Sequence, residues 1–421
     1  MTQPPLTTQT ESSQSVHSEL PLPEVPATAM VALTTIIVAH SNLIGFIAII
    51  AFYLLWLPQI FLRPRLILNK PGISLFILLP SLICTYSFFW SQVPQRSLYF
   101  GLQFVSMVIC SIIIARCCSI NSLVRGLVIG SALILVASIS SGHYHQDYFT
   151  GELSLFGYFG SKNQVGLYAD ISILSSLLIL FNGTKPEKFF LALPAIAISC
   201  IALVLCRSAG SLAALLLTIA AFTALFAFTK LKSPLRQITF AFMLLSIIIA
   251  TIFIHVHSVD LSGAALNSMG KDSTLTGRTY LWGEGIKAAL QRPILGYGYS
   301  AFWAPGMPLA ERYWAEFGIP DRTGFHFHNL LIQTQVDIGI FGLISIIGIL
   351  IGNLFGAIRH CLRNGLTYVG GYTFIVATLF GIRCFVEVDF LGQYNTGTLM
   401  VFSVLPILSV YASRLKDTPS A

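Results

Sequence analysis

The stretch around which this chain is organised begins TGRTYLWGEGIKAALQRPILGYGYSAFW at residues 276–303 and closes GFHFHNLL at residues 324–331. It is the core of the longest polar interruption, residues 258–327, in a chain that is otherwise almost entirely apolar. It carries arginines, a His-Phe-His sequence and many aromatic side chains. Because loops often carry function, this polar segment predicts an active site at a membrane surface.

The composition places the chain among membrane proteins. Of its 421 residues, 55% are hydrophobic and only 10% are charged, whereas soluble domains carry about 25% charged residues. Apolar runs of about 20 residues recur along the chain, which is the length that a membrane-spanning helix requires. These runs do not alternate with period two, as the strands of a membrane barrel do. The sequence therefore predicts an all-α polytopic membrane protein.

The apolar runs predict about 11 or 12 membrane helices. Residues 29–62 hold one or two of them. The others are expected near residues 73–90, 96–115, 122–141, 164–181, 189–206, 210–229, 236–256, 334–355, 366–383 and 394–413.

The expected organisation has five parts. Residues 1–28 are rich in Gln, Thr, Ser and Pro, which predicts a disordered tail. It is followed by N-terminal membrane helices over 29–257, a large periplasmic loop with short amphipathic helices over 258–327, C-terminal membrane helices over 328–413 and a cytoplasmic tail over 414–421.

The distribution of basic residues predicts the orientation. Lys and Arg gather in alternate loops, for example those holding Arg63 and Arg65, Lys185 and Lys188, and Arg359 and Arg363. Loops rich in Lys and Arg stay in the cytoplasm, so the segment 258–327 is expected on the opposite, periplasmic face.

Three cations on the predicted periplasmic face stand at the ends of membrane helices. They are Lys162, Arg207 and Arg383. Charges at such depths are expensive and tend to mark function.

Residues 278–291 are predicted to form a helix within the polar segment. Trp282, Ile286 and Leu290 recur on one face. Thr276 is the expected N-cap, and Pro293 ends the helix. Such a helix would lie along the membrane interface. The pattern alone fits equally a membrane-skimming helix without any chemistry.

Arg207, Arg278 and Lys162 are the candidates for binding a pyrophosphate. Arginine forks bind phosphate oxygens through two hydrogen bonds, and several cations neutralise a pyrophosphate without a metal. The alternative for each residue is a structural salt bridge or a contact with a lipid headgroup. Trp282, Tyr297, Trp303 and Asn329 are the predicted contacts to sugar or lipid, although aromatic side chains also serve as interface anchors.

His328 is the candidate general base, because the pKa of histidine suits proton removal from a hydroxyl near neutral pH. The alternative is a histidine that only caps the following helix. His326 and His328 could bind zinc together, but no third ligand stands at useful spacing, so no metal is predicted.

The acids are few. Asp170, Glu387 and Asp389 could pair with the cations, or one of them could act as the base in place of His328. No organic cofactor is predicted, and the spacing of the eight cysteines indicates no disulfide framework.

Five segments resemble one known family. They are GSKNQVG (160–166), CRSAGS (206–211), GRTYLWGEGI (277–286), RPILGYGYSAFW (292–303) and HNLLIQTQVDIGIFG (328–342). Together they are similar to the O-antigen ligase/polymerase superfamily, most closely to the ExoQ-type exopolysaccharide polymerases. ExoQ-type members often have His-Lys-Asn where this chain has Ser161-Lys162-Asn163.

The resemblance implies a glycosyltransferase that is metal-independent and inverting. It implies transfer from a polyprenyl-pyrophosphate-linked saccharide, of the undecaprenyl type, on the periplasmic face of the bacterial inner membrane. By motif match, the loop histidine that acts as base is His328, and the arginines on the pyrophosphate are Arg207 and Arg278.

The resemblance favours polymerisation of lipid-linked repeat units over two alternatives. An O-antigen ligase would move a finished chain to lipid A core. A transporter of lipid-linked sugar would show charges near the bilayer midplane and internal repeats, and no repeat is evident. The expected partners are the lipid-linked donor and acceptor, membrane lipid and other polysaccharide assembly and export proteins. No nucleic acid is expected.

Overall fold

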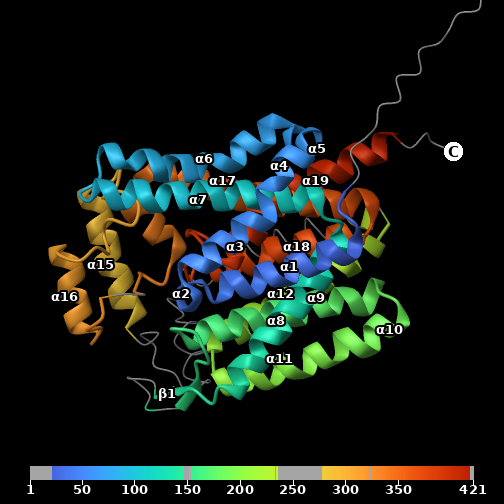
Figure 1. Ribbon diagram of the computed structural model, residues 1–421, viewed down its shortest axis with the longest axis horizontal. Coiled ribbons are helices and arrows are strands. Elements are labelled where there is room, and N and C mark those ends of the chain that lie inside the picture. Colours follow the sequence, from blue (N-terminus) through green and yellow to red (C-terminus); the bar gives the residue numbers. More distant parts are fainter. Residues whose placement is uncertain are drawn as a thin grey trace, which may run out of the picture.

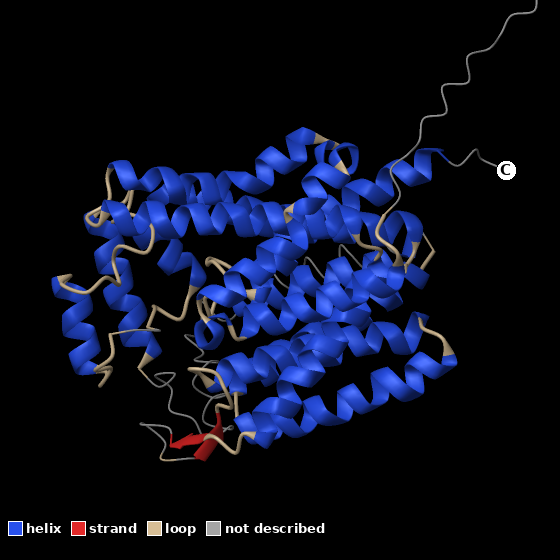
Figure 2. Cartoon of the chain, viewed as in Figure 1, coloured by secondary structure: helices blue, strands red, loops and turns tan. Residues whose placement is uncertain are grey.

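The computed structural model describes residues 21–146, 151, 153–232, 234–235, 277–322 and 325–417, and the side chains up to residue 412. Its described part is almost entirely helical, and its strands form one short hairpin (Figure 2). This confirms the predicted all-α polytopic class. The helix expected at 236–256 and most of the tail expected at 1–28 lie outside the described residues.

The first half of the chain forms these elements: α1 (Glu24–Ala39), α2 (Ser41–Ile44), α3 (Phe46–Trp56), α4 (Pro58–Leu62), α5 (Pro64–Leu68), α6 (Pro71–Tyr86), η1 (Ser87–Phe89), α7 (Pro94–Cys117), α8 (Ile120–Ser140), β1 (Tyr144–Gln146) and β2 (Leu153–Leu155).

The second half forms α9 (Lys162–Asn182), α10 (Lys185–Glu187), the π-helix η2 (Lys188–Ala192), α11 (Leu193–Cys206), α12 (Ala209–Lys230), α15 (Arg278–Gln291), α16 (Pro308–Glu316), α17 (Leu330–Asn364), α18 (Tyr368–Arg383) and α19 (Thr396–Asp417).

Seven helices in the described part are long and apolar enough to cross a membrane, and three shorter apolar helices accompany them. The predicted span at 29–62 is broken at Gly45, where φ is +67°, so this segment holds two helical parts. The helix α1 begins at Glu24, so residues 24–28 are helical and not part of a disordered tail. At the other end α19 continues to Asp417, into the predicted tail at 414–421.

The long helices run side by side along the longest axis of the molecule (Figure 1). The helix α8 packs between α1 and α9, and α7 packs between α6 and α19. The helices α15 and α16 and the β1–β2 hairpin lie at one end of this bundle, whereas α5 and α10 lie at the other. The predicted site residues Lys162, Arg207, Arg278 and His328 lie towards the end that carries α15.

The helix α17 is divided by a kink at Ile338 and Gly339. Gly339 has a φ of +64°, which L side chains rarely adopt, and a Cβ there would lie 2.1 Å from the carbonyl oxygen of Ile294. Only glycine fits both conditions. The kink separates the first turns of α17, which pack against α15, from the long membrane-spanning part.

The segment after α15 satisfies the backbone groups that the kink leaves without helical partners. The Tyr297 N–H donates to the Val336 carbonyl at 2.9 Å, and the Ile340 N–H donates to the Pro293 carbonyl at 3.0 Å. Buried backbone groups must find such partners. The Pro-x-x-Gly-x-Gly sequence is thus a backbone clamp on α17, and this clamp fixes the position of α15.

The helix α15 covers the residues predicted for it, 278–291, and Pro293 follows its end as expected. The predicted N-cap is wrong. Gly277, with a φ of +82°, occupies that position and offers no side-chain cap, and Thr276 lies outside the described residues.

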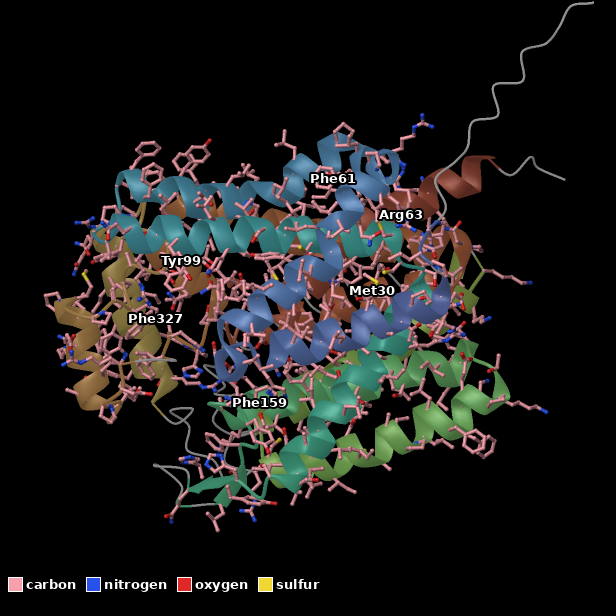
Figure 3. The ribbon with its side chains drawn as sticks, viewed as in Figure 1. Met30, Phe61, Arg63, Tyr99, Phe159 and Phe327 are labelled. Atoms are coloured by element: carbon pink, nitrogen blue, oxygen red, sulfur yellow. The ribbon has the colours of Figure 1, made fainter. Side chains whose placement is uncertain are left out.

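A separate aromatic core joins α15, α16 and the first turns of α17. We call it the α15–α16 lobe, and its buried aromatic residues are Tyr297, Phe302, Trp303, Tyr313, Trp314 and Phe327. Phe327 is fully buried there and lies beside α15 in Figure 3. The dense aromatic set of the sequence thus builds a small core of its own, which supports the residues that follow Phe327.

Candidate active site

The carboxylate of Glu387 lies at the centre of a polar cluster between four separate segments. Its Oε1 accepts a hydrogen bond from Nη2 of Arg278 at 2.9 Å and another from Nδ2 of Asn163 at 2.7 Å. The same guanidinium donates through Nη1 to the Val386 carbonyl at 2.7 Å. The helix α15 therefore begins with a side chain that is tied to the loop between α18 and α19.

Two histidines face the other oxygen of this carboxylate. Nδ1 of His328 lies 3.4 Å from Glu387 Oε2, and Nε2 of His326 lies 4.0 Å from it. The two rings are tilted against each other by 55°, with centroids 4.3 Å apart. We call Asn163, Arg278, His326, His328 and Glu387 the Glu387 cluster.

A backbone hydrogen bond fixes the tautomer of His326. The His328 N–H donates to Nδ1 of His326 at 3.0 Å, so this nitrogen carries a lone pair and no proton. Burial, followed by the charges of His328 and Arg278, lowers the pKa of His326 to about 3. His326 is therefore neutral at pH 7, with its proton on Nε2, which faces Glu387.

His326, His328 and Glu387 bring three potential metal ligands together, with all donor atoms within 4.8 Å of one another. The third ligand missing from the sequence pattern is thus Glu387, which folding brings from a distant loop. The set nevertheless does not fit a metal well. A metal needs a lone pair on Nε2 of His326, and that nitrogen carries the proton because Nδ1 accepts the His328 N–H.

The protonation of Glu387 follows from its neighbours. Burial raises its pKa, but the interactions with His328 and Arg278 outweigh this effect, so the net pKa lies well below the usual range. Glu387 is therefore a carboxylate at neutral pH. Its Oε2 can accept a hydrogen bond from Nδ1–H of His328, which would leave Nε2 of His328 as the basic nitrogen.

The backbone is strained at two predicted site residues. His328 has a φ of +49° and Arg207 a φ of +48°, in the left-handed region that non-glycine residues rarely occupy. Such strain costs about 1–3 kcal/mol and is frequent at functional sites.

Lys162 and Arg207 stand next to residues that belong to the cluster or touch it. Lys162 precedes Asn163, and Arg207 precedes Ser208, whose hydroxyl donates to Oδ1 of Asn163 at 2.9 Å. The close approach of α9 and α12 requires Gly166, since a Cβ there would lie 2.3 Å from the Ser211 hydroxyl. Arg278 thus belongs to the Glu387 cluster, and the backbones of Lys162 and Arg207 lie one residue away from Asn163 and Ser208 in the same network.

Ser161 has a local structural role. Its side chain accepts the Asn163 N–H at 3.2 Å and so caps α9, at the position where ExoQ-type members often have histidine. The departure from that pattern preserves the start of the helix and the position of Asn163.

A second buried cluster lies beside the first. The guanidinium of Arg383 binds Asp389 through two hydrogen bonds, at 2.6 and 3.3 Å, donates to Ser211 at 2.9 Å and lies 3.5 Å from Asp170. The predicted acids thus pair with cations: Asp170 and Asp389 with Arg383, and Glu387 with Arg278. Because Asp389 and Glu387 share one loop, the Arg383 pair also fixes the position of Glu387.

The predicted sugar or lipid contacts fall into three environments. Tyr297 and Trp303 are buried in the α15–α16 lobe, where Trp303 donates to Gln333 at 3.1 Å, so packing accounts for both. Asn329 caps α17 by accepting the N–H groups of Leu331 and Ile332, and it donates to the Phe385 carbonyl.

Trp282 differs from these. Its indole N–H is buried without a hydrogen bond in the described part of the chain, so it has a donor that a ligand oxygen could satisfy. The contact of any of these four residues with sugar or lipid stays a prediction.

The sequence interpretation missed the role of Asn163. The motif GSKNQVG contains it, but the charge of Lys162 makes that residue the more obvious candidate for phosphate binding. An amide in the first turn of a membrane helix, two residues after a capping serine, was the available signal.

Comparison with known proteins identifies relatives. A family described as O-Antigen ligase matches residues 194–347. The chain is also 36% identical over 397 residues to the "Exopolysaccharide production protein ExoQ" of Rhizobium meliloti (strain 1021), a match that covers 94% of this chain and 91% of that protein.

Proposed function

Because this chain belongs to the O-antigen ligase family, as a relative of ExoQ, we propose that it polymerises polyprenyl-pyrophosphate-linked repeat units into exopolysaccharide. The family supports a membrane polymerase or ligase role. The identity over nearly the whole length of an exopolysaccharide production protein favours polymerisation.

The observation that carries the proposed mechanism is the His328–Glu387 pair at 3.4 Å, beside the Arg278 guanidinium. A carboxylate that faces one ring nitrogen holds a histidine in the tautomer whose other nitrogen accepts a proton. The distance is longer than a formed hydrogen bond, and such contacts often tighten only when the substrate is bound. His328 is therefore proposed as the general base, with Glu387 as its positioning residue.

The proposed step is a single displacement. Nε2 of His328 removes the proton of an acceptor sugar hydroxyl while that oxygen attacks the anomeric carbon of the donor. The bond from that carbon to the pyrophosphate oxygen breaks, and polyprenyl pyrophosphate leaves with the electron pair. One displacement inverts the configuration at the anomeric carbon.

The leaving group gains negative charge, so nearby cations stabilise the transition state. Arg207, Arg278 and Lys162 are proposed to bind its phosphates without a metal. A guanidinium has five N–H donors, so the contacts of Arg278 with Val386 and Glu387 do not exhaust it.

The active site is proposed to face the periplasm from the bacterial inner membrane. The cluster lies at the end of the bundle that carries α15 and α16, and the loops rich in Lys and Arg belong to the opposite end. Polyprenyl-pyrophosphate donors, of the undecaprenyl type, would then reach the site from the outer leaflet, and export proteins would receive the product.

The deciding experiment is turnover of a purified polyprenyl-pyrophosphate oligosaccharide in the presence of EDTA. We expect longer lipid-linked glycan from the unaltered protein and from His360→Ala, a control because His360 bonds Thr367 near the far end of α17. His328→Ala should form no product. Product that requires added metal would contradict the mechanism, and transfer only to lipid A core would identify a ligase.

A further inference from the structure

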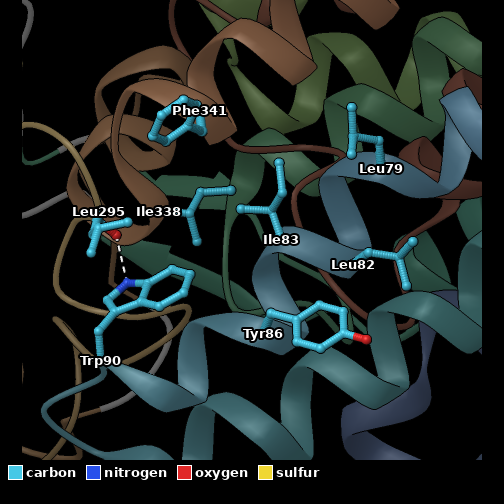
Figure 4. Close-up of a pocket in the computed structure, with 8 residues that line it drawn as sticks. All are labelled: Leu79, Leu82, Ile83, Tyr86, Trp90, Leu295, Ile338 and Phe341. Carbon is cyan, nitrogen blue, oxygen red and sulfur yellow. Dashed lines mark hydrogen bonds between the residues drawn. The ribbon is translucent and has the colours of Figure 1, made fainter.

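An apolar cavity lies beside the kink of α17, away from the Glu387 cluster. Its volume is about 360 Å³, and it is lined by Leu79, Leu82, Ile83, Tyr86, Trp90, Leu295, Ile338 and Phe341. Ile83 and Ile338 face each other across it in Figure 4. Because Ile338 is one of the two kink residues, the bend of α17 helps to shape this cavity.

The lining of the cavity suits hydrocarbon and not sugar. Its one indole N–H, that of Trp90, already donates to the Leu295 carbonyl at 2.7 Å, as the dashed line in Figure 4 shows. Apart from the hydroxyl of Tyr86, the remaining lining side chains are apolar. A sugar would therefore lose more hydrogen bonds with water than it could regain there, whereas burial of a hydrocarbon chain is favourable.

A row of exposed apolar side chains extends from the cavity towards the helix start that carries Arg278. Ile286 is 51% exposed, Leu290 is 72% exposed and Ile294 is 59% exposed. Ile286 and Leu290 lie in the second half of α15, and Ile294 lies just beyond it, next to Leu295 of the cavity; Arg278 is the first residue of the same helix. At 1.5 Å per residue, this helix of 14 residues spans about 21 Å.

We propose that this row and the cavity bind the polyprenyl chain of the donor whose pyrophosphate lies at Arg278, an inference that rests on the proposed function. The donor is an anionic head on a long hydrocarbon chain. The protein presents the matching order, with cations at one end of α15 and an apolar cavity at the other. The separation of about 21 Å between these two ends suits a donor with a long tail, and the experiment below distinguishes this donor from an ordinary phospholipid of the bilayer.

The test compares two donors with the same glycan, one on a full-length polyprenyl tail and one on a short isoprenoid tail. Leu79→Trp fills the cavity from its rim. Since each displaced methylene weakens binding several-fold, we expect the KM for the long-tail donor to rise about tenfold. The KM for the short-tail donor should not change, because a short tail does not reach the cavity.

Leu75→Trp is the matched control. It lies one turn earlier on α6, is 64% exposed and does not line the cavity, so it should change neither KM. As an independent variant, Leu290→Gln interrupts the row on α15 and should also weaken only the long-tail donor. Its control is Leu216→Gln on α12, at a residue that is also exposed.

The outcomes separate the two proposals. If the unaltered protein turns over neither donor, the proposed function is wrong and the lipid site falls with it. If both donors are used but Leu79→Trp and Leu290→Gln leave the ratio of the two KM values unchanged, the cavity holds ordinary bilayer lipid and only the lipid site is refuted.

Discussion

Glu387 and Arg278 form a salt bridge of 2.9 Å between the loop before α19 and the first residue of α15. Both partners are largely buried, so each compensates the charge of the other. The pair joins a segment rich in polar and aromatic residues to the last loop of the described chain. The same salt bridge orients the carboxylate of Glu387, so that its second oxygen faces His326 and His328.

Glu387→Gln is expected to lower kcat on the order of 10²-fold, because an amide can present its N–H₂ to His328 and no longer holds the basic tautomer. The pH–rate profile should shift as well, which loss of packing alone would not produce. Glu311→Gln is the control, since Glu311 pairs with Arg322 in the α15–α16 lobe. An unchanged kcat in Glu387→Gln would contradict the proposed role.

Arg278→Lys should reduce kcat/KM by about tenfold or more. A lysine is a single point charge and cannot bind the Val386 carbonyl and Glu387 with the geometry of a guanidinium. Arg312→Lys should change kcat/KM little, because Arg312 binds Glu284 at an exposed position. Equal effects of the two substitutions, measured with the same donor, would show that Arg278 has no special role.

Asn163→Ala should lower kcat by about tenfold to a hundredfold, since it removes one donor to Glu387 and one acceptor of Ser208. Asn182→Ala, at the other end of α9, removes only a bond to the Leu178 carbonyl and should leave kcat unchanged. The result against our assignment is full activity in Asn163→Ala with unaltered folding.

The stability of the protein should fall as the pH drops below neutrality. The pKa of His326 is lowered to about 3 in the folded state from an ordinary value of 6.5, so the unfolded chain binds a proton first. Folding free energy is therefore lost as the pH falls from 6.5 towards 3, and Glu387 adds to the loss below its own ordinary pKa of 4.5.

Between pH 7.5 and pH 5, the protonation of His326 in the unfolded chain should lower the free energy of unfolding by about 2 kcal/mol. This decrease is measured as the drop in the thermal unfolding midpoint of the detergent-solubilised protein. His326→Asn keeps an acceptor for the His328 N–H and does not titrate, so its drop should be smaller. An identical drop in the variant and the unaltered protein would refute this account.

Gly339→Ala should destabilise the protein by about 1–3 kcal/mol, because its Cβ meets the carbonyl of Ile294 and its φ is positive. The thermal unfolding midpoint should fall accordingly. Gly381→Ala is the control, since a Cβ there meets nothing within 4 Å. If Gly339→Ala has the same unfolding midpoint as Gly381→Ala, the close packing of the 293–298 segment against the kink of α17 does not contribute to stability.

The sequence predicted individual helices well, because their periodicity and hydropathy are properties of neighbouring residues. The periodicity of Trp282, Ile286 and Leu290 predicted α15 with its observed ends, and the long apolar runs predicted most of the described spans to within a few residues. The exception is α17, which continues to Asn364, beyond the predicted end at 355. Hydropathy could not show that Tyr297 and Trp303 are buried, because the small core that covers them is formed by other segments.

The contacts of the site could not be read from spacing. His328 and Glu387 are separated by two helices, and their meeting depends on the kink of α17 and on the pair of Arg383 with Asp389. The His-Phe-His sequence suggested a metal pair or a base. Only the backbone bond between His328 and His326 distinguishes these possibilities, and backbone bonds of this kind have no signature in the sequence.

The position of Glu387 between α18 and α19 has a consequence for biogenesis. Asn163, Arg278 and His328 all precede it in the chain, so a nascent protein lacks the central carboxylate until the segment after α18 has been synthesised and inserted. A shortened chain that ends before this loop would still enter the membrane and would hold a guanidinium without its counter-charge. Under the proposed mechanism, activity therefore requires the complete topology, and a partly inserted chain is inactive.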